Sequence, residues 1–511
     1  MDTYSNPISV HSTWLDCNIP DAYNDVISVR YEKVMLIGRK VEIQRLEKLY
    51  TSKEAEFAVL YGRRRVGKTY LIRHFFNNKK CLFFQATGLQ KGSLAIQIKH
   101  FTESLSETFT PGIGLQIPSS WEDAFKLLTQ LVEKRKFENK IVFFLDELPW
   151  MATRRSGLLE ALDYYWNHHW SRNENIILVV CGSSASWLIK NIINNKSGLH
   201  NRRTCEIKLE PFTLTESYDY LKYKGITLNK RHVLDLYMAL GGVPYYLKYV
   251  ESGLTAVENI QNIFFNKNAP LQDEFSKLFK SLFIEADAYI KLLEFIATKK
   301  EGMSRVAIEE AFSSGGGRLT ERLNQLVQTS FIEEDAPWDK QRGVYYRVVD
   351  EFCLFYMYWL KGSKLKKVTH DYWIKQTQKP IYYVWAGYAF EAVCHKHVTN
   401  IINALNIKSA EEISSWRFVP RTRHENGTQI DLLIDRSDDA ITLCEIKYTE
   451  SPFSINKSYS QNLKRKIEIF KEKTLTKKQI FLCMISANGI KETSYSKELV
   501  SGVVTLDEFF E

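Results

Sequence analysis

The sequence predicts an α/β protein of several domains, with a parallel sheet in its first half and a second, smaller α/β domain near its end. Three observations favour this fold class. The 511 residues exceed the about 100–200 that one domain usually holds. Apolar runs alternate with helical patterns between residues 38 and 184. Two further apolar runs, 428–435 and 440–448, follow a largely helical stretch.

Four short apolar runs are the expected strands of the first sheet. They are residues 57–62, 80–87, 141–147 and 175–184. Helical spacing of apolar residues is found in 38–50, 69–76 and 121–135. Because strands that alternate with helices form parallel sheets covered on both faces, residues 36–210 are predicted to be one such domain.

The other boundaries follow from changes of pattern. Residues 1–35 are polar and mixed, and are interpreted as an N-terminal extension. Residues 211–285 are helical, with a break at Gly241-Gly242-Val243-Pro244. Residues 286–370 combine three helices, a two-stranded wing and a basic linker, a pattern typical of a winged helix. Residues 371–511 are predicted to form the second α/β domain.

Composition bounds the protein class. The apolar and charged fractions are those of a globular protein, and the net charge of +9 favours approach to a phosphate backbone without identifying a partner. The eight cysteines form no C-x-x-C pair, so we expect reduced thiols in a cytoplasmic protein rather than a zinc site. We find no signal-peptide pattern and no apolar run near the ~20 residues that cross a bilayer, so no membrane partner is expected.

The segment GRRRVGKT (62–69) matches the P-loop pattern G-x-x-x-x-G-K-[ST]. Glycine lets backbone N–H groups approach a phosphate, and the helix N-terminus adds a positive dipole end. Lys68 is expected to contact the β- and γ-phosphates of ATP, and Thr69 to bind Mg²⁺. An ordinary glycine turn is the alternative, but a strand precedes this one and a helix follows it. The expected nucleotide-binding residues are Gly62, Arg65, Val66, Gly67, Lys68, Thr69 and Tyr70.

A P-loop predicts an acidic strand end that binds Mg²⁺, and IVFFLDE (141–147) supplies one. Asp146 is the expected metal ligand, and Glu147 is expected to polarise the attacking water. After the fourth strand, Ser183 or Ser184 is a candidate to sense the γ-phosphate, with a simple turn as the alternative. Arg203, or its neighbour Arg202, is a candidate arginine finger from a neighbouring subunit of a homo-oligomer; the alternative is a solvated arginine.

A second group of chemically active residues lies near the end of the chain. The strands TQIDLLID (428–435) and AITLCEIKY (440–448) flank a turn. Folding at Asp438 or Asp439 brings Asp431 opposite Glu445 or Lys447, and the period of two places Glu445 and Lys447 on one face. Carboxylates bind Mg²⁺, and a lysine can orient or deprotonate a water. The alternative is a solvated hairpin.

Six motifs give the chain a family resemblance. They are LIGRKVEIQRL, VLYGRRRVGKTYLIRHFF, FFLDELPWM, CGSSASWL, NRRTCEIKLEPF and GGVPYYL. In this order they resemble the archaeal-type ATPase family, a branch of the AAA+/STAND P-loop ATPases, over about residues 36–360. The resemblance implies an AAA+ core, a helical lid containing Gly242 and Pro244, and a winged helix. It does not identify what the ATPase acts on.

The C-terminal segment resembles the PD-(D/E)XK nuclease fold, also called restriction-endonuclease-like, which many members of that family carry. The resemblance implies that Asp431 and Glu445 bind the metal, Mg²⁺ or alternatively Mn²⁺, and that Lys447 assists catalysis. It also implies a further metal ligand, Glu391, and a helix glutamine, Gln461. A nuclease fold that binds DNA or protein without cutting is a middle interpretation. His395 and His397 are expected to be ordinary histidines rather than ligands.

Nucleic-acid contacts have two candidate regions. The expected recognition helix of the winged helix carries Arg318, Arg322, Asn324 and Gln325. Such a helix can instead pack as part of the lid. Basic residues also surround the acidic cluster, although a charge run is usually a solvated face. They are Arg417, Arg421, Arg423, Lys457, Lys464, Arg465 and Lys466.

Together these patterns predict an ATPase that is also an ATP-dependent or ATP-regulated DNA nuclease with a Mg²⁺-dependent endonuclease site. By family analogy alone, defence or mobile-element maintenance is the expected setting. The main alternative is a nucleotide-dependent signalling switch whose C-terminal domain only binds DNA or a protein partner. A protein-remodelling ATPase is a third interpretation.

Overall fold

The computed structural model describes residues 36–511 apart from 135–136, 195–201, 300–301, 313–315, 336–337, 339–342, 362–370, 419 and 421–426. The chain divides into two units, Met1–Leu36 and Ile37–Glu511, and the elements below lie in the second. The expected N-terminal extension 1–35, most of the expected basic linker, and Arg421 and Arg423 lie outside the described residues.

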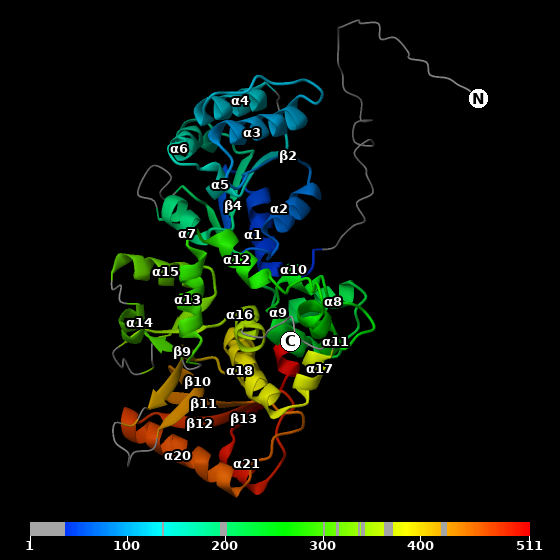
Figure 1. Cartoon of the computed structure of the whole chain (residues 1–511). Helices are drawn as coiled ribbons and strands as arrows, with labels where there is room; N and C mark the ends of the chain where they lie inside the picture. The colour runs from blue at the N-terminus through cyan, green and yellow to red at the C-terminus, as the bar shows by residue number, and fades with distance from the viewer. Residues whose placement is uncertain are drawn as a thin grey trace, which may run out of the picture. The chain divides into compact units, whose positions relative to one another are not determined.

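The first sheet has five parallel strands in the order β2-β3-β4-β1-β5 (Figure 1). The strands are β1 (Glu56–Tyr61), β2 (Cys81–Thr87), β3 (Lys140–Asp146), β4 (Ile176–Gly182) and β5 (Cys205–Lys208). The predicted parallel sheet and its four expected strands are confirmed. The fifth strand, β5, was not predicted, because its four residues at the sheet edge are only partly buried and include two charges.

Helices cover both faces of this sheet. The apolar side chains of one face pack with α3 (Leu94–Phe109), α4 (Trp121–Glu133) and α6 (Leu158–His168). The helices α1 (Lys40–Thr51) and α2 (Lys68–Asn77) lie on the other face (Figure 1). Short elements complete the domain: α5 (Leu148–Met151), α7 (Ala185–Leu188), the 3-10 helix Trp170–Arg172 and the π-helix Ile189–Ile193.

Helices make up residues 212–282, as predicted. They are α8 (Leu214–Tyr223), α9 (Lys230–Leu240), α10 (Pro244–Leu247), α11 (Ala256–Ile260), the π-helix Gln261–Phe265 and α12 (Glu274–Leu282). The predicted break is confirmed between α9 and α10. Gly242 has φ +65°, and a Cβ there would lie 2.1 Å from the carbonyl oxygen of Phe212. Its own carbonyl accepts a hydrogen bond from Phe212 N at 2.8 Å, so this glycine joins the helices to the end of the first domain.

Three helices and a small sheet follow. The helices are α13 (Ala286–Ile296), α14 (Arg305–Phe312) and α15 (Gly317–Gln328). The antiparallel sheet has the order β6-β8-β7, with β6 (Met303–Ser304), β7 (Ile332–Asp335) and β8 (Tyr345–Val348). The sequence predicted two strands here; the third, β6, has only two residues, too few to leave a periodic pattern.

The C-terminal α/β region has a five-stranded mixed sheet in the order β13-β12-β11-β10-β9. Its strands are β9 (Ala410–Phe418), β10 (Thr428–Arg436), β11 (Ala440–Lys447), β12 (Gln479–Ser486) and β13 (Gly502–Val504). The helix α16 (Glu351–Phe355) and the π-helix Tyr356–Leu360 precede this region. Its own helices are α17 (Tyr372–Thr377), α18 (Pro380–Lys396), α19 (Val398–Ala404), α20 (Lys457–Thr474), α21 (Ser494–Leu499) and the final 3-10 helix Asp507–Phe510.

Two helices sandwich this second sheet. The apolar side chains of α18 pack on one face, and those of α20 pack on the other (Figure 1). The strand β9 was not predicted, because most of its side chains are exposed or polar. No helix among the described residues is long and apolar enough to cross a membrane.

Candidate ATP site and C-terminal acidic cluster

The P-loop turns sharply between β1 and α2. Gly62 and Gly67 have φ of +146° and +96°, and a Cβ on Gly62 would lie 2.2 Å from the carbonyl oxygen of Leu209. The buried Lys68 Nζ donates to the carbonyls of Gly62 and Arg63, each at 2.9 Å. Burial lowers the pKa of Lys68, an effect that nearby acids partly offset. The ammonium is therefore held inside the loop, where a phosphate group would lie.

The predicted metal ligands of the ATP site come together. Thr69 Oγ1 donates to Asp146 Oδ2 at 2.8 Å, although the two residues lie on different strand–helix units. They meet because β1 and β3 are parallel and end at the same edge of the sheet. A hydroxyl and a carboxylate are oxygen donors of the kind Mg²⁺ prefers, so this pair fits the metal of a nucleotide complex.

Glu147 is held next to the end of β4. Its Oε2 accepts hydrogen bonds from the backbone N and the hydroxyl of Ser183, each at 3.0 Å. Its backbone is left-handed, with φ +50°, which directs the side chain across to the neighbouring strand. Of the two serine candidates, the structure therefore places Ser183 beside Glu147, while Ser184 precedes α7.

The remaining predicted nucleotide-binding residues lie in different settings. Val66 is buried within the loop. Arg65 forms an ion pair with Glu274 of α12, and its guanidinium lies 4.2 Å from the ring centre of Tyr245. Tyr70 is half exposed on α2, and its ring stacks on that of His74 in the next turn of the helix. Arg65 therefore connects the P-loop to the helical region.

Arg203 is engaged within its own chain. It forms an ion pair with Glu206, and its Nη1 donates to the carbonyl of Ile193 at 2.8 Å. Its role as an arginine finger concerns a second subunit and stays a prediction. Two other arginines beside the ATP site, Arg39 and Arg63, were not singled out from the sequence, because their partners lie far along the chain.

Arg39, the residue before α1, stabilises the P-loop through hydrogen bonds to backbone carbonyls. It is 5% exposed, and its guanidinium donates to the carbonyls of Val66 at 3.1 Å and Glu210 at 2.6 Å. Burial lowers the pKa of Arg39, while Glu216 opposes that shift. The arginine of LIGRK thus ties the start of α1 to the loop that holds phosphate.

The acidic residues near the end of the chain form a cluster, here called the C-terminal acidic cluster: Glu391, Asp431, Glu445 and Lys447. The hairpin pairs Leu432 with Cys444, and continuing this register by one residue sets Asp431 opposite Glu445. Asp431 Oδ2 accepts a hydrogen bond from the backbone N of Ile446 at 3.0 Å. Of the alternatives considered from the sequence, the hairpin therefore folds about Asp438 and brings Asp431 to Glu445.

Glu445 is bound by cations on both oxygens. Its Oε1 lies 2.8 Å from Lys447 Nζ, and its Oε2 lies 2.7 Å from Lys466 Nζ. The hydroxyl of Tyr459 also donates to Oε1. Lys466 and Tyr459 belong to α20. Lys466 was among the basic residues expected around the cluster, whereas Tyr459 was not singled out from the sequence, since it is not part of the D…E-x-K pattern.

The carboxylates of the cluster perturb one another. Burial, and then the charge of Asp431, raises the pKa of Glu391 to about 8. Burial, and then the charge of Glu445, raises the pKa of Asp431 to about 6. Burial opposes ionisation of Glu445, but Lys447 and Lys466 outweigh it and lower its pKa. This is the pattern of acids crowded in a shielded site.

The cluster has the chemistry of a divalent-cation site but not its geometry. Three carboxylates supply the oxygen donors that Mg²⁺ or Mn²⁺ takes. Within the described part of the chain, however, no three His, Cys, Asp or Glu side chains are placed to hold one ion together. The reason is visible at Glu445, whose two oxygens point to lysine ammonium groups.

Two other predicted residues have settled positions. His395 Nε2 lies 2.9 Å from the carbonyl oxygen of Asp431, and burial lowers its pKa to about 3. This contact is made to the backbone of Asp431. Gln461 is exposed and lines an open cavity of about 550 Å³ with Tyr459 and Arg465. The side chains that reach Glu445 are therefore those of Tyr459 and Lys466 rather than Gln461.

Basic residues approach the cluster from β8 of the small sheet and from the segment after α13. Lys299 and Arg347 line a cavity of about 60 Å³ together with Glu391 and Tyr388. On α15, Arg318 is exposed, but Arg322 pairs with Glu285 at 2.5 Å.

The four predicted recognition residues of α15 do not share one free face; they are Arg318, Arg322, Asn324 and Gln325. Gln325 accepts a hydrogen bond from Tyr289 on α13. The helix α15 also contacts α7 of the first domain. This is the packing considered as the alternative to DNA contact.

The parallel sheet, the P-loop and the paired Thr69 and Asp146 define a P-loop ATPase domain. Comparison with known proteins specifies the kind. Residues 36–250 match a family described as an ATPase domain predominantly from Archaea. Residues 36–250 are therefore similar to archaeal-type ATPase domains, the resemblance that the motifs predicted for this part of the chain. The predicted resemblance extended to about residue 360, whereas the match ends at 250.

Individual relatives are similar over different lengths. The uncharacterized protein MJECL04 of Methanocaldococcus jannaschii is 25% identical over 442 residues, covering 85% of this chain and 92% of that protein. The uncharacterized ATP-binding protein MJ0423 of the same organism is 50% identical over 50 residues, covering 10% of this chain and 85% of that protein. Among solved structures, the Walker-type ATPase PABY2304 of Pyrococcus abyssi has 19% identity and a TM-score of 0.45, covering 62% of this chain and 95% of that one.

Proposed function

We propose that this protein is an ATP-dependent or ATP-regulated, metal-dependent DNA nuclease, with the ATP site in residues 36–210 and the nuclease site in residues 371–511. The observation that carries the proposal is the convergence of Glu391, Asp431, Glu445 and Lys447 from one helix and two strands. Four such residues, brought together on a mixed sheet sandwiched by helices, support the nuclease-like fold.

In this proposal Asp431, Glu445 and Glu391 would hold Mg²⁺ or Mn²⁺ if the lysines that bind Glu445 yielded to the cation. The chemistry that the ion supplies is polarisation of the phosphodiester and acidification of an attacking water. Burial opposes the charge of Lys447, but Glu445 outweighs it and raises the pKa of Lys447. A lysine that keeps its proton is suited to orient the water and neutralise the phosphate rather than to act as the base.

DNA is the proposed substrate, and its backbone would approach the cluster past basic side chains. Lys299 and Arg347 border the cavity beside Glu391. Their charges suit a phosphate backbone, and Tyr388 offers an aromatic surface for a base. The proposed winged helix, residues 286–370, would then guide the strand with its sheet, while α15 packs toward α7.

A second function is favoured by one specific observation. Both oxygens of Glu445 are bound by lysines, so the carboxylates are not gathered for a metal. This arrangement suits a nucleotide-dependent switch whose C-terminal region binds DNA or a protein partner without cutting. The two functions differ in whether the lysines yield to a divalent cation.

Plasmid cleavage separates the two functions. The purified chain is incubated with supercoiled plasmid and Mg²⁺ or Mn²⁺, with and without ATP. Nicking that disappears in Asp431→Ala and persists in Asp438→Ala supports the nuclease, because Asp438 lies in the turn of the same hairpin, where it pairs with Arg436. Loss of ATP stimulation in Lys68→Ala would show that the two sites are linked. ATP hydrolysis without any cutting of DNA or RNA would favour the switch.

A further inference from the structure

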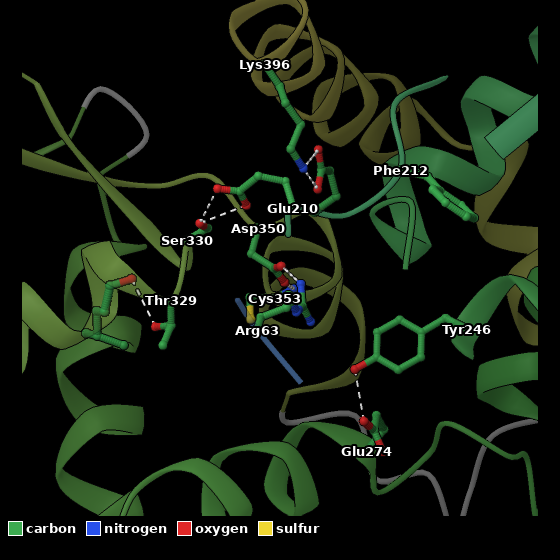
Figure 2. Close-up of polar contacts among 12 residues, drawn as sticks. Arg63, Glu210, Phe212, Tyr246, Glu274, Thr329, Ser330, Asp350, Cys353 and Lys396 are labelled. Carbon is green, nitrogen blue, oxygen red and sulfur yellow. Dashed lines mark hydrogen bonds and ion pairs between the residues drawn. The ribbon is translucent and has the colours of Figure 1, made fainter. Parts of the chain in front are cut away.

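Arg63 is a P-loop residue whose side chain does not face the phosphate site. It is 2% exposed, and its guanidinium forms an ion pair with Asp350, 287 positions further along the chain (Figure 2). The guanidinium carbon lies 5.2 Å from the ring centre of Phe331 and 5.9 Å from that of Tyr246. The second residue of the P-loop is therefore anchored in the region between the helical domain and the small sheet.

The same residue is also bound to Lys68, the expected phosphate-binding lysine. The carbonyl of Arg63 accepts a hydrogen bond from Lys68 Nζ at 2.9 Å. When Lys68 moves toward a phosphate, this bond must change, and the backbone that carries the Arg63 side chain is free to change with it. Side chain and carbonyl of one residue thus join the phosphate-binding lysine to Asp350.

This anchor is costly for the fold. Arg63 Nε and Nη2 are buried and have no hydrogen-bond partner among the residues that the structure describes. A buried ion pair seldom stabilises a protein more than apolar side chains of equal size, because both charges lose their hydration. A buried charge in a P-loop position that tolerates many residues is therefore better explained by a role in conformation than by stability.

Asp350 begins a second connection. Its Oδ1 accepts the backbone N–H of Cys353 at 2.9 Å and so caps α16. The next residue, Glu351, is fully buried, and each of its oxygens lies 2.8 Å from Lys396 Nζ. Lys396 is the last residue of α18, the helix that also carries Glu391 of the C-terminal acidic cluster.

The region around Asp350 and Lys396 has room for side chains to move. A cavity of about 470 Å³ is lined by Glu210, Tyr237, Ser330, Asp350 and Lys396, among others. Ser330 also donates to both oxygens of Glu210, at 3.0 and 3.2 Å (Figure 2). Close-packed interiors resist movement, so a cavity lined by one member of each ion pair, Asp350 and Lys396, permits the shift that a coupled element needs.

We propose that Asp350 is a positioning residue of the ATP site, acting through Arg63, and that Asp350 and Glu351 together couple ATP binding to helix α18. ATP draws Lys68 from the carbonyl of Arg63, the Arg63–Asp350 pair adjusts, and the start of α16 passes the change to Lys396. The coupling is reciprocal, so restraint of α18 alters the affinity for ATP. The proposal rests on the ATP site and not on nuclease activity.

Steady-state ATP hydrolysis tests the positioning role. Asp350→Asn keeps the cap of α16, because asparagine caps helices as well as aspartate does, but removes the anion that holds Arg63. We expect the KM for ATP to rise about tenfold with kcat changed less than about threefold, since the pair sets the loop before chemistry begins. An unchanged KM, or an equal loss in kcat, would refute this role.

Hydrogen exchange tests the coupling to α18. In the wild-type chain, a non-hydrolysable ATP analogue is expected to slow exchange in residues 380–396 about fivefold. The double variant Arg63→Met/Asp350→Leu replaces the pair by apolar side chains of similar size and is expected to fold. In this variant, with the analogue at saturating concentration, the nucleotide effect on 380–396 should vanish.

Lys396→Met should remove the same effect while leaving the KM for ATP within about threefold. The control is Arg305→Met, which breaks a partly exposed pair with Glu309 on α14. It should retain the full effect. A double variant that folds, binds the analogue and still protects α18 would overturn the proposed coupling, whether or not the protein cuts DNA.

Discussion

His397 is expected to make the protein less stable in mild acid. It is 3% exposed at the end of α18, with its Nε2 accepting the backbone N–H of Leu214 at 3.0 Å. Its Nδ1 lies 2.9 Å from the carbonyl oxygen of Val393 and donates to it. Burial lowers the pKa of His397 to about 4, with nearby Lys396 lowering it further and Glu216 opposing. A proton on Nε2 would break the bond to Leu214.

The size of the effect follows from linkage. An unfolded histidine has a pKa of about 6.5, so the unfolded chain binds this proton first as the pH falls. The stability is fully present above pH 6.5 and is lost as the pH falls toward 4. Between pH 7.5 and pH 5.0 the loss assigned to this one group is about 2 kcal/mol.

Urea unfolding of the wild type and His397→Gln at the two pH values measures this. The variant is less stable at pH 7.5, but the difference between the proteins should shrink by about 2 kcal/mol at pH 5.0. His100→Gln, a change at an exposed position of α3, is the control and should follow the wild type at both pH values. A difference that changes by less than about 0.5 kcal/mol would show that His397 is not held neutral by the fold.

Three further variants test the ATP site and the lid. Glu147→Gln should lower hydrolysis about 100-fold or more while nucleotide affinity stays within about threefold, which a binding titration beside an ATPase assay would show. Thr69→Ala should raise the Mg²⁺ concentration for half-maximal hydrolysis about tenfold; an unchanged Mg²⁺ profile would contradict the ligand role. Gly242→Ala should lower the free energy of unfolding by about 3 kcal/mol, because φ is +65° and a Cβ would strike the Phe212 carbonyl. The control is Gly253→Ala, where φ is +81° but no atom lies within 4 Å of the added Cβ; it should lower the free energy of unfolding by about 1 kcal/mol. Equal losses of stability in the two variants would disprove the steric argument.

Coupling between the ATP site and the C-terminal region has a physical basis whichever C-terminal function holds. Arg65 pairs with Glu274 of α12, and Arg63 pairs with Asp350 before α16. Two of the three arginines at the variable positions of the P-loop are thus bound to segments outside the ATPase sheet. A change in the conformation of the loop therefore acts on these segments first. The helix α16 is in turn connected to α18 by the ion pair between Glu351 and Lys396.

Local patterns were enough to predict much of this protein. The P-loop, the acid pair after β3 and the hairpin that carries Asp431 and Glu445 each occupy one short segment, so spacing and periodicity reveal them. The strands that were missed, such as β5 and β9, have partly exposed or charged residues and leave no apolar run.

The tertiary structure decided which charged residues become partners when they lie far apart in the chain. Arg63 meets Asp350 across 287 positions, and Lys466 meets Glu445 from a helix on one face of the sheet. No periodicity relates such residues, because their distance depends on how whole helices and sheets pack. The sequence alone determined which chemistry the chain can host; the packing decided that Glu445 faces two lysines and that the P-loop is bound to the start of α16.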